Sequence, residues 1–329
     1  MSETPLRIGV LGAARIAPMA LLRPAKQVRG VSVAAVAARD TARAQAFATK
    51  HGIPRVHASY DALLADADID AIYNPLPNSL HCEWSIRALQ AGKHVLCEKP
   101  IASNAAEAER MAAAARAADR VLMEAFHWRY HPLAARMRGI IDAGELGTVR
   151  HVEAHFCIPL PFPRDIRYQL PLAGGATMDT GCYAISIVRF LAGAEPEVTR
   201  AQARLWSPGV DRYMEADFRF ADGRTGRMTC ALLCAALFRD SARVRGDRGE
   251  MRVLNPVAPH FFHRLTVRND VGTRSERLDG DSTYTHQLRA FLAAVRNGRP
   301  VPTGPDDAIA NMRVIDAVYA KAGLQPRGT

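Results

Sequence analysis

The chain has 329 residues, 48% of them hydrophobic, which is more than one core usually organises and predicts two domains. Mean hydropathy is −0.10 and no apolar run reaches about 18 residues, which argues against a membrane span. The net charge is +10, but the basic residues are spread among acids and form no strip of the kind that binds nucleic acid. The charge suits an anionic cofactor or substrate, with a solvated basic surface that has no binding role as the alternative.

The chain opens on an apolar strand, Leu6 to Leu11, that runs into small residues. The dinucleotide fingerprint Gly-x-Gly-x-x-Gly/Ala is present here as Gly12, Ala14 and Ala17, so only its first glycine is kept. Gly12 would make the tight turn, and the backbone N–H groups near Arg15 and Ile16 would face the pyrophosphate. Small residues at a strand end also occur in many other sheets, so this motif alone is weak.

A second strand, Val31 to Ala37, ends in Ala38-Arg39-Asp40. A carboxylate near this point usually binds the adenine ribose of NAD, whereas an arginine suits the 2′-phosphate of NADP. Asp40 lies one position late and is better explained as the N-cap of a helix over residues 41–50. Arg39 therefore favours NADP, with NAD as the alternative.

A third strand, Ala71 to Tyr73, leads into a loop with two prolines. We expect Leu76 and Asn78 to line the ribose side of the cofactor and His81 to lie at its rim. The alternative is a capped loop in which Asn78 or Ser79 only begins the next helix.

A fourth strand, His94 to Cys97, ends in Glu98-Lys99-Pro100. Lys99 thus lies at the carboxyl end of a parallel strand, where open α/β sheets bind ligands, and we expect Glu98 and Lys99 to border the cofactor. A helix should follow from Asn104, with Glu107 as its capping partner. A fifth strand, Val121 to Met123, completes a doubly wound parallel sheet of the Rossmann type over residues 1–125.

These residues resemble the Gfo/Idh/MocA oxidoreductases. The resemblance lies in residues 7–100, above all 76–81 and 92–100, and continues through 174–183 to 311–317. It is nearest the branch of NADP-dependent dihydrodiol and D-xylose dehydrogenases and sugar-nucleotide 3-ketoreductases. It implies a dehydrogenase or reductase that moves a hydride between nicotinamide C4 and a CH–OH carbon of a sugar, polyol or cyclic diol. A sugar-nucleotide 3-ketoreductase and a non-enzymatic NADP-binding sensor or co-repressor are the alternatives.

The second half, residues 126–329, should form an α+β domain that binds substrate. After a helix near residues 133–143, segments with a period of two predict a large, mainly antiparallel open sheet. Those segments are Val149 to Phe156, Val198 to Leu205, Met214 to Phe220, Thr225 to Leu232 and Arg274 to Leu278. Helices over 284–296 and 305–322 complete the domain. The resemblance implies a homodimer or larger homo-oligomer formed through the open face of the sheet.

The run Asp179-Thr180-Gly181-Cys182-Tyr183 is the strongest catalytic candidate in this half. If Tyr183 begins a helix through Leu191, Asp179 and Tyr183 share one face. An ammonium such as Lys99 nearby would favour the phenolate and bring Tyr183 into range for proton transfer. The family commonly has Asp with His four residues later, and Tyr occurs there in the branch named above. Without that likeness, the pair would be a helix cap and a packing residue.

Other candidates would line the substrate pocket. They are His127, Trp128 and Arg129 beside the nicotinamide, Phe162, Arg167 and Tyr168 in a Pro-rich loop that also carries Asp165, and Tyr284. Glu124, His127 and His131 have a spacing that could chelate a metal, as have His151 and His155. Pro132 argues against a regular helix that would present the first set, and we expect no metal site.

Six scattered cysteines, among them Cys230 and Cys234 without zinc-site spacing, are typical of reduced thiols in the cytoplasm. The first strand begins within a few residues of Met1, which leaves no room for a signal peptide. We therefore expect a cytoplasmic enzyme with a small-molecule substrate and neither nucleic acid nor membrane as a partner.

Overall fold

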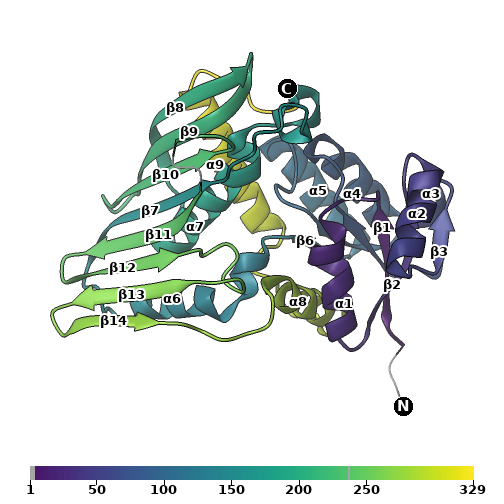
Figure 1. Ribbon diagram of the computed structural model, residues 1–329, viewed down its shortest axis with the longest axis horizontal. Coiled ribbons are helices and arrows are strands. Elements are labelled where there is room, and N and C mark those ends of the chain that lie inside the picture. The colour runs from purple at the N-terminus through teal and green to yellow at the C-terminus, as the bar shows by residue number, and fades with distance from the viewer. Residues whose placement is uncertain (1–3, 236–237) are drawn as a thin grey trace. The chain divides into compact units, whose positions relative to one another are not determined.

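The structure is a computed structural model that describes residues 4–235 and 238–329. The chain divides into two compact units (Figure 1). The first comprises Met1–His127 and Tyr284–Ile309, and the second comprises Trp128–Thr283 and Ala310–Thr329. The chain thus returns to the first unit after passing through most of the second, a return that the sequence did not suggest.

The first unit is built on a parallel sheet. Its strands are β1 (Leu6–Leu11), β2 (Val31–Ala37), β3 (Arg55–His57), β4 (Ala71–Asn74), β5 (His94–Cys97) and β6 (Leu122–Glu124). They lie in the order β3-β2-β1-β4-β5-β6, and every pair is parallel. This is the doubly wound order of dinucleotide-binding folds, with the switch point between β1 and β4. The predicted Rossmann sheet is confirmed.

Helices connect these strands, and their caps explain where they begin. They are α1 (Arg23–Gln27), α2 (Thr41–His51), α3 (Tyr60–Ala65), α4 (His81–Gln90) and α5 (Ala105–Ala118). Asp40 accepts a hydrogen bond from the backbone N–H of Arg43 at 3.1 Å, so the predicted N-cap of α2 is confirmed. Asn104 caps α5 in the same way, accepting from the N–H of Glu107 at 2.9 Å.

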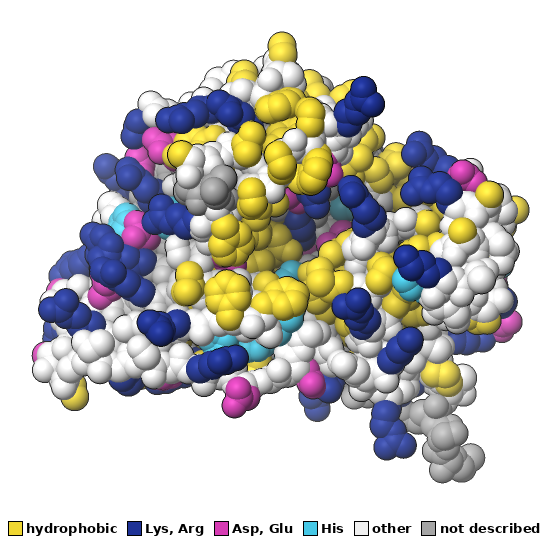
Figure 2. All heavy atoms as spheres, in the orientation of Figure 1, with side chains coloured by type: hydrophobic (Ala, Val, Ile, Leu, Met, Phe, Trp, Pro, Cys, Tyr) yellow, Lys and Arg dark blue, Asp and Glu magenta, His cyan; other side chains and the backbone are white. Residues whose placement is uncertain are grey.

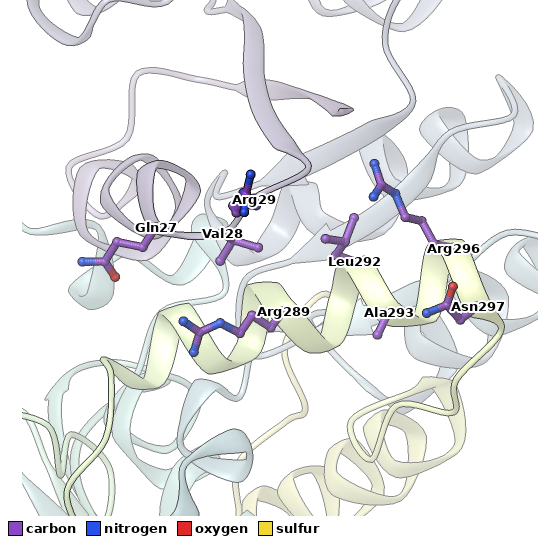
Figure 3. Close-up of a pocket in the computed structure, with 8 residues that line it drawn as sticks. All are labelled: Gln27, Val28, Arg29, Arg289, Leu292, Ala293, Arg296 and Asn297. Atoms are coloured by element: carbon purple, nitrogen blue, oxygen red, sulfur yellow. The ribbon is translucent and has the colours of Figure 1, made fainter. Parts of the chain in front are cut away.

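Helix α8 (Thr283–Asn297) also packs in the first unit. Arg296 donates to the backbone carbonyls of Thr4 at 2.7 Å and Gly30 at 3.3 Å, and Thr285 donates to Gln27 at 2.8 Å. A groove of about 480 Å³ lies between residues 27–29 and the part of α8 from residue 289 to residue 297. Figure 3 shows the side chains that line it. The groove lies just before β2 begins, at the amino ends of the strands, and so is not the ligand crevice expected at their carboxyl ends.

The second unit is built on an eight-stranded sheet. Its strands are β7 (Val149–Cys157), β8 (Glu197–Ser207), β9 (Val210–Arg219), β10 (Thr225–Ala231), β11 (Arg239–Gly246), β12 (Gly249–Leu254), β13 (Arg264–Asn269) and β14 (Gly272–Glu276). They lie in the order β14-β13-β12-β11-β7-β10-β9-β8. Neighbours are antiparallel except β7 and β10, which run parallel, so the predicted mainly antiparallel sheet is confirmed.

The two faces of this sheet differ in chemistry. Helix α7 (Cys182–Ala192) packs on β7 and β10, and α6 (Pro132–Asp142) lies beside α7. Buried side chains such as Val152, Ala154 and Met228 occupy alternate strand positions. The intervening positions carry ion pairs such as Arg227–Asp217, 2.6 Å apart. In Figure 2, Lys and Arg side chains stand over the strands at the left, with a few Asp and Glu side chains between them.

Among the helices that the structure describes, none is both long enough and apolar enough to span a bilayer. The last helix, α9 (Pro305–Lys321), begins in the first unit and ends in the second.

Candidate active site

The turn after β1 has the geometry of a dinucleotide loop. Gly12 has φ +83°, a left-handed conformation that favours glycine, and its N–H donates to the Ala37 carbonyl at 2.6 Å. A Cβ there would lie 3.1 Å from Cδ2 of Leu76. Ala17 is fully buried, which lets the following helical segment lie close to the sheet. Residues 14–16 form the turn between them, with Arg15 exposed. These features fit a bound pyrophosphate.

Arg39 lies at the carboxyl end of β2 and is exposed. Asp40 beside it is occupied as the cap of α2, so its carboxylate is directed to the helix. The Tyr60 side chain lies next to Arg39, and its pKa is raised mainly by burial and lowered in part by the arginine charge. This leaves Arg39 as the group suited to an anionic ligand at the end of this strand.

His81 holds two backbone segments together. The ring is 1% exposed, with Nε2 2.8 Å from the Leu76 carbonyl and Nδ1 2.8 Å from the Pro100 carbonyl. Burial lowers the pKa of His81 to about 4, and the two carbonyls act against this shift, because only the protonated ring can donate to both. The sequence placed His81 at the cofactor rim, whereas its ring nitrogens face the backbone on either side. Asn78, three residues earlier, begins a short 3₁₀ turn, Asn78–Leu80.

The Glu98-Lys99-Pro100 segment follows β5 directly and contacts two tyrosines. Glu98 is 9% exposed and accepts a hydrogen bond from the Tyr73 hydroxyl at 2.7 Å. Burial, together with the charge of Glu98, raises the pKa of Tyr284 on α8. Lys99 is half-buried at the end of the strand. Lys99 therefore leaves the sheet next to a buried carboxylate that accepts a hydrogen bond from Tyr73 and whose charge acts on Tyr284.

The predicted pocket residues His127 and Tyr284 lie together in the first unit. Their ring centroids are 4.1 Å apart at an interplanar angle of 36°. His127 is 3% exposed and Tyr284 7%. The α8 helix therefore brings Tyr284 to the carboxyl ends of β5 and β6, a contact between residues far apart in the sequence.

In the second unit, Asp179 and Tyr183 lie on one helical segment. A π-helical turn, Thr177–Gly181, carries Asp179 and passes into α7, where Tyr183 is the second residue. The Asp179 carboxylate lies 2.8 Å from Nε of Arg167, whose Nη1 lies 3.1 Å from Asp165. Asp179 raises the pKa of Arg167, which stays charged. Tyr183 is 5% exposed and its ring meets that of Phe156 edge-on, with centroids 5.4 Å apart.

The other residues predicted to line the substrate pocket differ from one another in burial and in packing partners. Tyr168 is buried, donates to the Leu160 carbonyl at 2.8 Å and packs on Trp206. Phe162 is 65% exposed. Trp128 is 1% exposed and meets Phe190 edge-on, and the Arg129 guanidinium lies 4.3 Å above the Phe190 ring. Contact of these side chains with substrate stays a prediction.

His131 is the N-cap of α6, accepting from the N–H of Leu133 at 3.1 Å. Over residues 4–235 and 238–329, no three His, Cys, Asp or Glu side chains gather as a metal site would require.

The sequence did not indicate a buried ion pair, Asp211 with Arg327, 2.8 Å apart in the second unit. Asp211 lies just after a Pro-Gly turn and Arg327 follows the last helix, so their local sequence carries no signal of burial.

Comparison with known proteins agrees with this geometry. The family described as "Oxidoreductase family, NAD-binding Rossmann fold" matches residues 6–126, and the GFO/IDH/MocA C-terminal domain matches residues 134–252. The chain is 36% identical over 318 residues to D-xylose 1-dehydrogenase (NADP(+)) 2 of Haloferax volcanii, covering 96% of this chain and 97% of that protein. It is 33% identical to dTDP-3,4-didehydro-2,6-dideoxy-alpha-D-glucose 3-reductase of Actinomadura kijaniata, covering 98% and 97%.

A crystal structure of a 3-ketoreductase from Actinomadura kijaniata, in complex with NADP and TDP-benzene, superposes with a TM-score of 0.90 at 32% identity, covering 97% of this chain and 98% of that one. The chain belongs to the GFO/IDH/MocA family of oxidoreductases, and its first unit holds that family's NAD-binding Rossmann fold.

Proposed function

We propose that this protein is an NADP-dependent oxidoreductase that acts on a CH–OH carbon of a sugar, polyol or cyclic diol, or on the matching ketone. The observation that carries the proposal is the position of Lys99 at the end of β5, on the same sheet edge as the Gly12 turn. The NADP-dependent D-xylose dehydrogenase similar over nearly the whole chain supports it.

The residues of the first unit fit NADP. The N–H groups of residues 14–16 would hold the pyrophosphate and Arg39 the 2′-phosphate, while Leu76 and Asn78 would border a ribose. When bound, NADP takes or gives a hydride at C4 of its nicotinamide.

The protein must then handle the proton of the reacting hydroxyl. Lys99 would donate a hydrogen bond to the substrate oxygen and stabilise the alkoxide that develops as the hydride leaves. Tyr183 would carry the proton away, or return it during reduction. Asp179, fixed by Arg167, would orient Tyr183 or a neighbouring substrate hydroxyl. Either Lys99 or Tyr183 can be the formal acid–base.

A second candidate is reduction of a 3-keto sugar nucleotide. The observation that favours it is the TM-score of 0.90 to the 3-ketoreductase solved with TDP-benzene. The same Lys99 and Tyr183 would serve, with the proton delivered to the new hydroxyl. A sensor without catalysis is disfavoured because it has no need for Lys99, Asp179 and Tyr183 together.

We also propose that the protein is cytoplasmic and forms a homodimer or larger homo-oligomer through the open face of the sheet in the second unit. The oligomer is the one that the resemblance of this half of the chain to the family's C-terminal domain implies. All six cysteines are free thiols, which suits a reducing compartment.

The test is turnover with NADP and NAD against a panel of aldoses, inositols, cyclic diols and a dTDP-3-keto sugar, alongside cofactor binding by fluorescence. Turnover of an aldose, inositol or diol with NADP supports the first proposal, and turnover of the keto sugar alone supports the second. NADP binding without any turnover would support the sensor, and no binding of either dinucleotide would overturn all three.

A further inference from the structure

A fully buried carboxylate lies beneath the segment that carries Asp179. Asp211, at the start of β9, is 0% exposed. Its Oδ2 accepts two hydrogen bonds from Thr177, from the backbone N–H and the hydroxyl, both at 2.7 Å. Its Oδ1 accepts from the Tyr319 hydroxyl at 2.9 Å and from Arg327 at 2.8 Å. All of these residues belong to the second unit.

Arg327 connects this carboxylate to the preceding turn. Its side chain is 2% exposed, and Nε donates to the Gly174 carbonyl at 2.7 Å while Nη2 reaches Asp211. The guanidinium lies 4.0 Å above the Tyr319 ring. A planar guanidinium can make these two bonds and the ring contact together, which a lysine cannot.

At Gly175 the backbone of the turn lies so close to Asp211 and Arg327 that a side chain would have no room. Gly175 has φ +138°, and a Cβ there would lie 2.2 Å from Oδ1 of Asp211 and 2.8 Å from Nη2 of Arg327. The carboxylate and the guanidinium therefore pack directly against the main chain of the turn.

This turn fixes both partners of the Arg167–Asp179 ion pair. The N–H of Gly175 donates to the Arg167 carbonyl at 2.8 Å, and the N–H of Asp179 donates to the Gly175 carbonyl at 3.1 Å. Thr177, held by Asp211, is the first residue of the π-helical turn that leads into Tyr183. A shift of the turn would therefore move Arg167, Asp179 and Tyr183 as a group.

We propose that Asp211 and Arg327 are positioning residues for the reaction, acting through Thr177 and Gly174 on the placement of Asp179 and Tyr183. The proposal rests on the proposed function of those two residues. Asp211 and Arg327 themselves are enclosed by protein groups and take no part in proton or hydride transfer.

The test compares Arg327→Met with Arg136→Met. Arg136 also pairs with a carboxylate in the second unit, Glu276 at 2.6 Å, but makes no hydrogen bond or ion pair with residues 165–183 among those described. Arg327→Met should lower kcat roughly 10- to 100-fold, the effect of a small misplacement of reacting groups, with the NADP dissociation constant unchanged. Arg327→Lys should recover part of kcat, because it keeps the charge beside Asp211. Arg136→Met should retain wild-type kcat.

Hydrogen exchange measured by mass spectrometry gives a readout independent of turnover. Exchange in peptides from residues 165–183 should rise in Arg327→Met and not in Arg136→Met. If Arg327→Met does not fold, Tyr319→Phe, which removes one donor to Asp211, should show the same pattern more weakly.

The two proposals fail in distinguishable ways. If exchange in residues 165–183 rises in Arg327→Met but the wild-type protein turns over no substrate, the proposed function is contradicted. The support that Arg327 gives to this segment would still stand. Unchanged exchange and unchanged kcat in both Arg327→Met and Tyr319→Phe, beside an inactive Tyr183→Phe, would overturn the positioning role alone.

Discussion

Nδ1 of His81 lies 2.8 Å from the carbonyl oxygen of Pro100, the residue that follows Lys99. Since its other nitrogen faces the Leu76 carbonyl, one buried ring links the loop after β4 to the loop after β5. We expect His81→Asn to destabilise the protein by roughly 1–3 kcal/mol, as loss of a buried hydrogen bond does. It should also lower kcat at saturating NADP. His94→Asn is the control, because His94 also bonds to backbone, at the other end of β5. If His81→Asn and His94→Asn have equal kcat, the connection of the two loops through His81 does not affect catalysis.

Replacing Lys99 tests the proposed alkoxide stabilisation. Lys99→Met should abolish turnover while NADP affinity stays within several-fold, because the lost interaction forms mainly with the reacting oxygen. Lys50→Met, at an exposed position of α2, is the control. Steady-state kinetics with cofactor titration measures both quantities. A folded, active Lys99→Met protein would remove Lys99 from the mechanism.

Tyr183→Phe should lower turnover by about two to four orders of magnitude, the usual span for a general acid–base. Tyr213→Phe is the matched control, since its hydroxyl bonds only Glu215 among the described contacts, at 2.9 Å. Rates over a range of pH should lose one ionisation in Tyr183→Phe. If turnover is unchanged, the proton must travel through another group.

Arg39→Ala should weaken NADP binding roughly 10- to 100-fold, as expected for loss of a charge-assisted hydrogen bond. NAD lacks the 2′-phosphate, so its affinity should not change. Arg110→Ala, exposed on α5, controls for general loss of positive charge. Equal losses for the two dinucleotides, measured by fluorescence titration, would show that Arg39 does not read the phosphate.

Asp240 gives the fold a pH dependence. It is 1% exposed, and burial raises its pKa to about 8. The unfolded chain releases this proton near pH 4 and the folded chain retains it, so stability falls as pH rises from about 4 to 8, by at most about 1.4 kcal/mol per pH unit. Asp240→Asn should therefore raise Tm, with a gap that widens up to about pH 8.

Asp142→Asn should lower Tm, because the hydrogen bond from Arg138 lowers the pKa of Asp142 in the folded protein. This loss should be constant above about pH 4 and should disappear as the pH falls below it. Scanning calorimetry from about pH 2 to pH 8 tests both variants. A constant Tm difference between Asp240→Asn and wild type would show that Asp240 is ionised in the folded protein.

The sequence predicted five of the six strands of the first unit, because each of the five is a short, mainly apolar run. It did not reveal β3, which is only three residues long and half-buried, or the short helix α3 after it. It also did not reveal β11 to β13. Their apolar residues alternate with arginines, as in Met251, Arg252 and Val253. The period of two that indicates a strand was therefore present, but the many charged residues made these segments resemble loops.

For the candidate site, local sequence could identify chemical groups but not their partners. The spacing of Asp179 and Tyr183 indicated a shared helix, whereas the approach of Arg167 depends on a turn that residues 211 and 327 support. The packing of Trp128 on Phe190 likewise joins residues about sixty positions apart. Such contacts depend on tertiary packing, for which a single sequence has no periodic signal.

The return of residues 284–309 to the first unit has a practical consequence. A fragment that ends at residue 127 would contain every strand of the parallel sheet and the Gly12 turn, yet lack α8, which belongs to the same unit. The ring of His127 and the carboxylate of Glu98 would lose Tyr284, and the backbone of Thr4 would lose its bond to Arg296. Cofactor binding by this unit should therefore be studied in the whole chain, or in a permuted chain that rejoins residues 284–309 to the first strand.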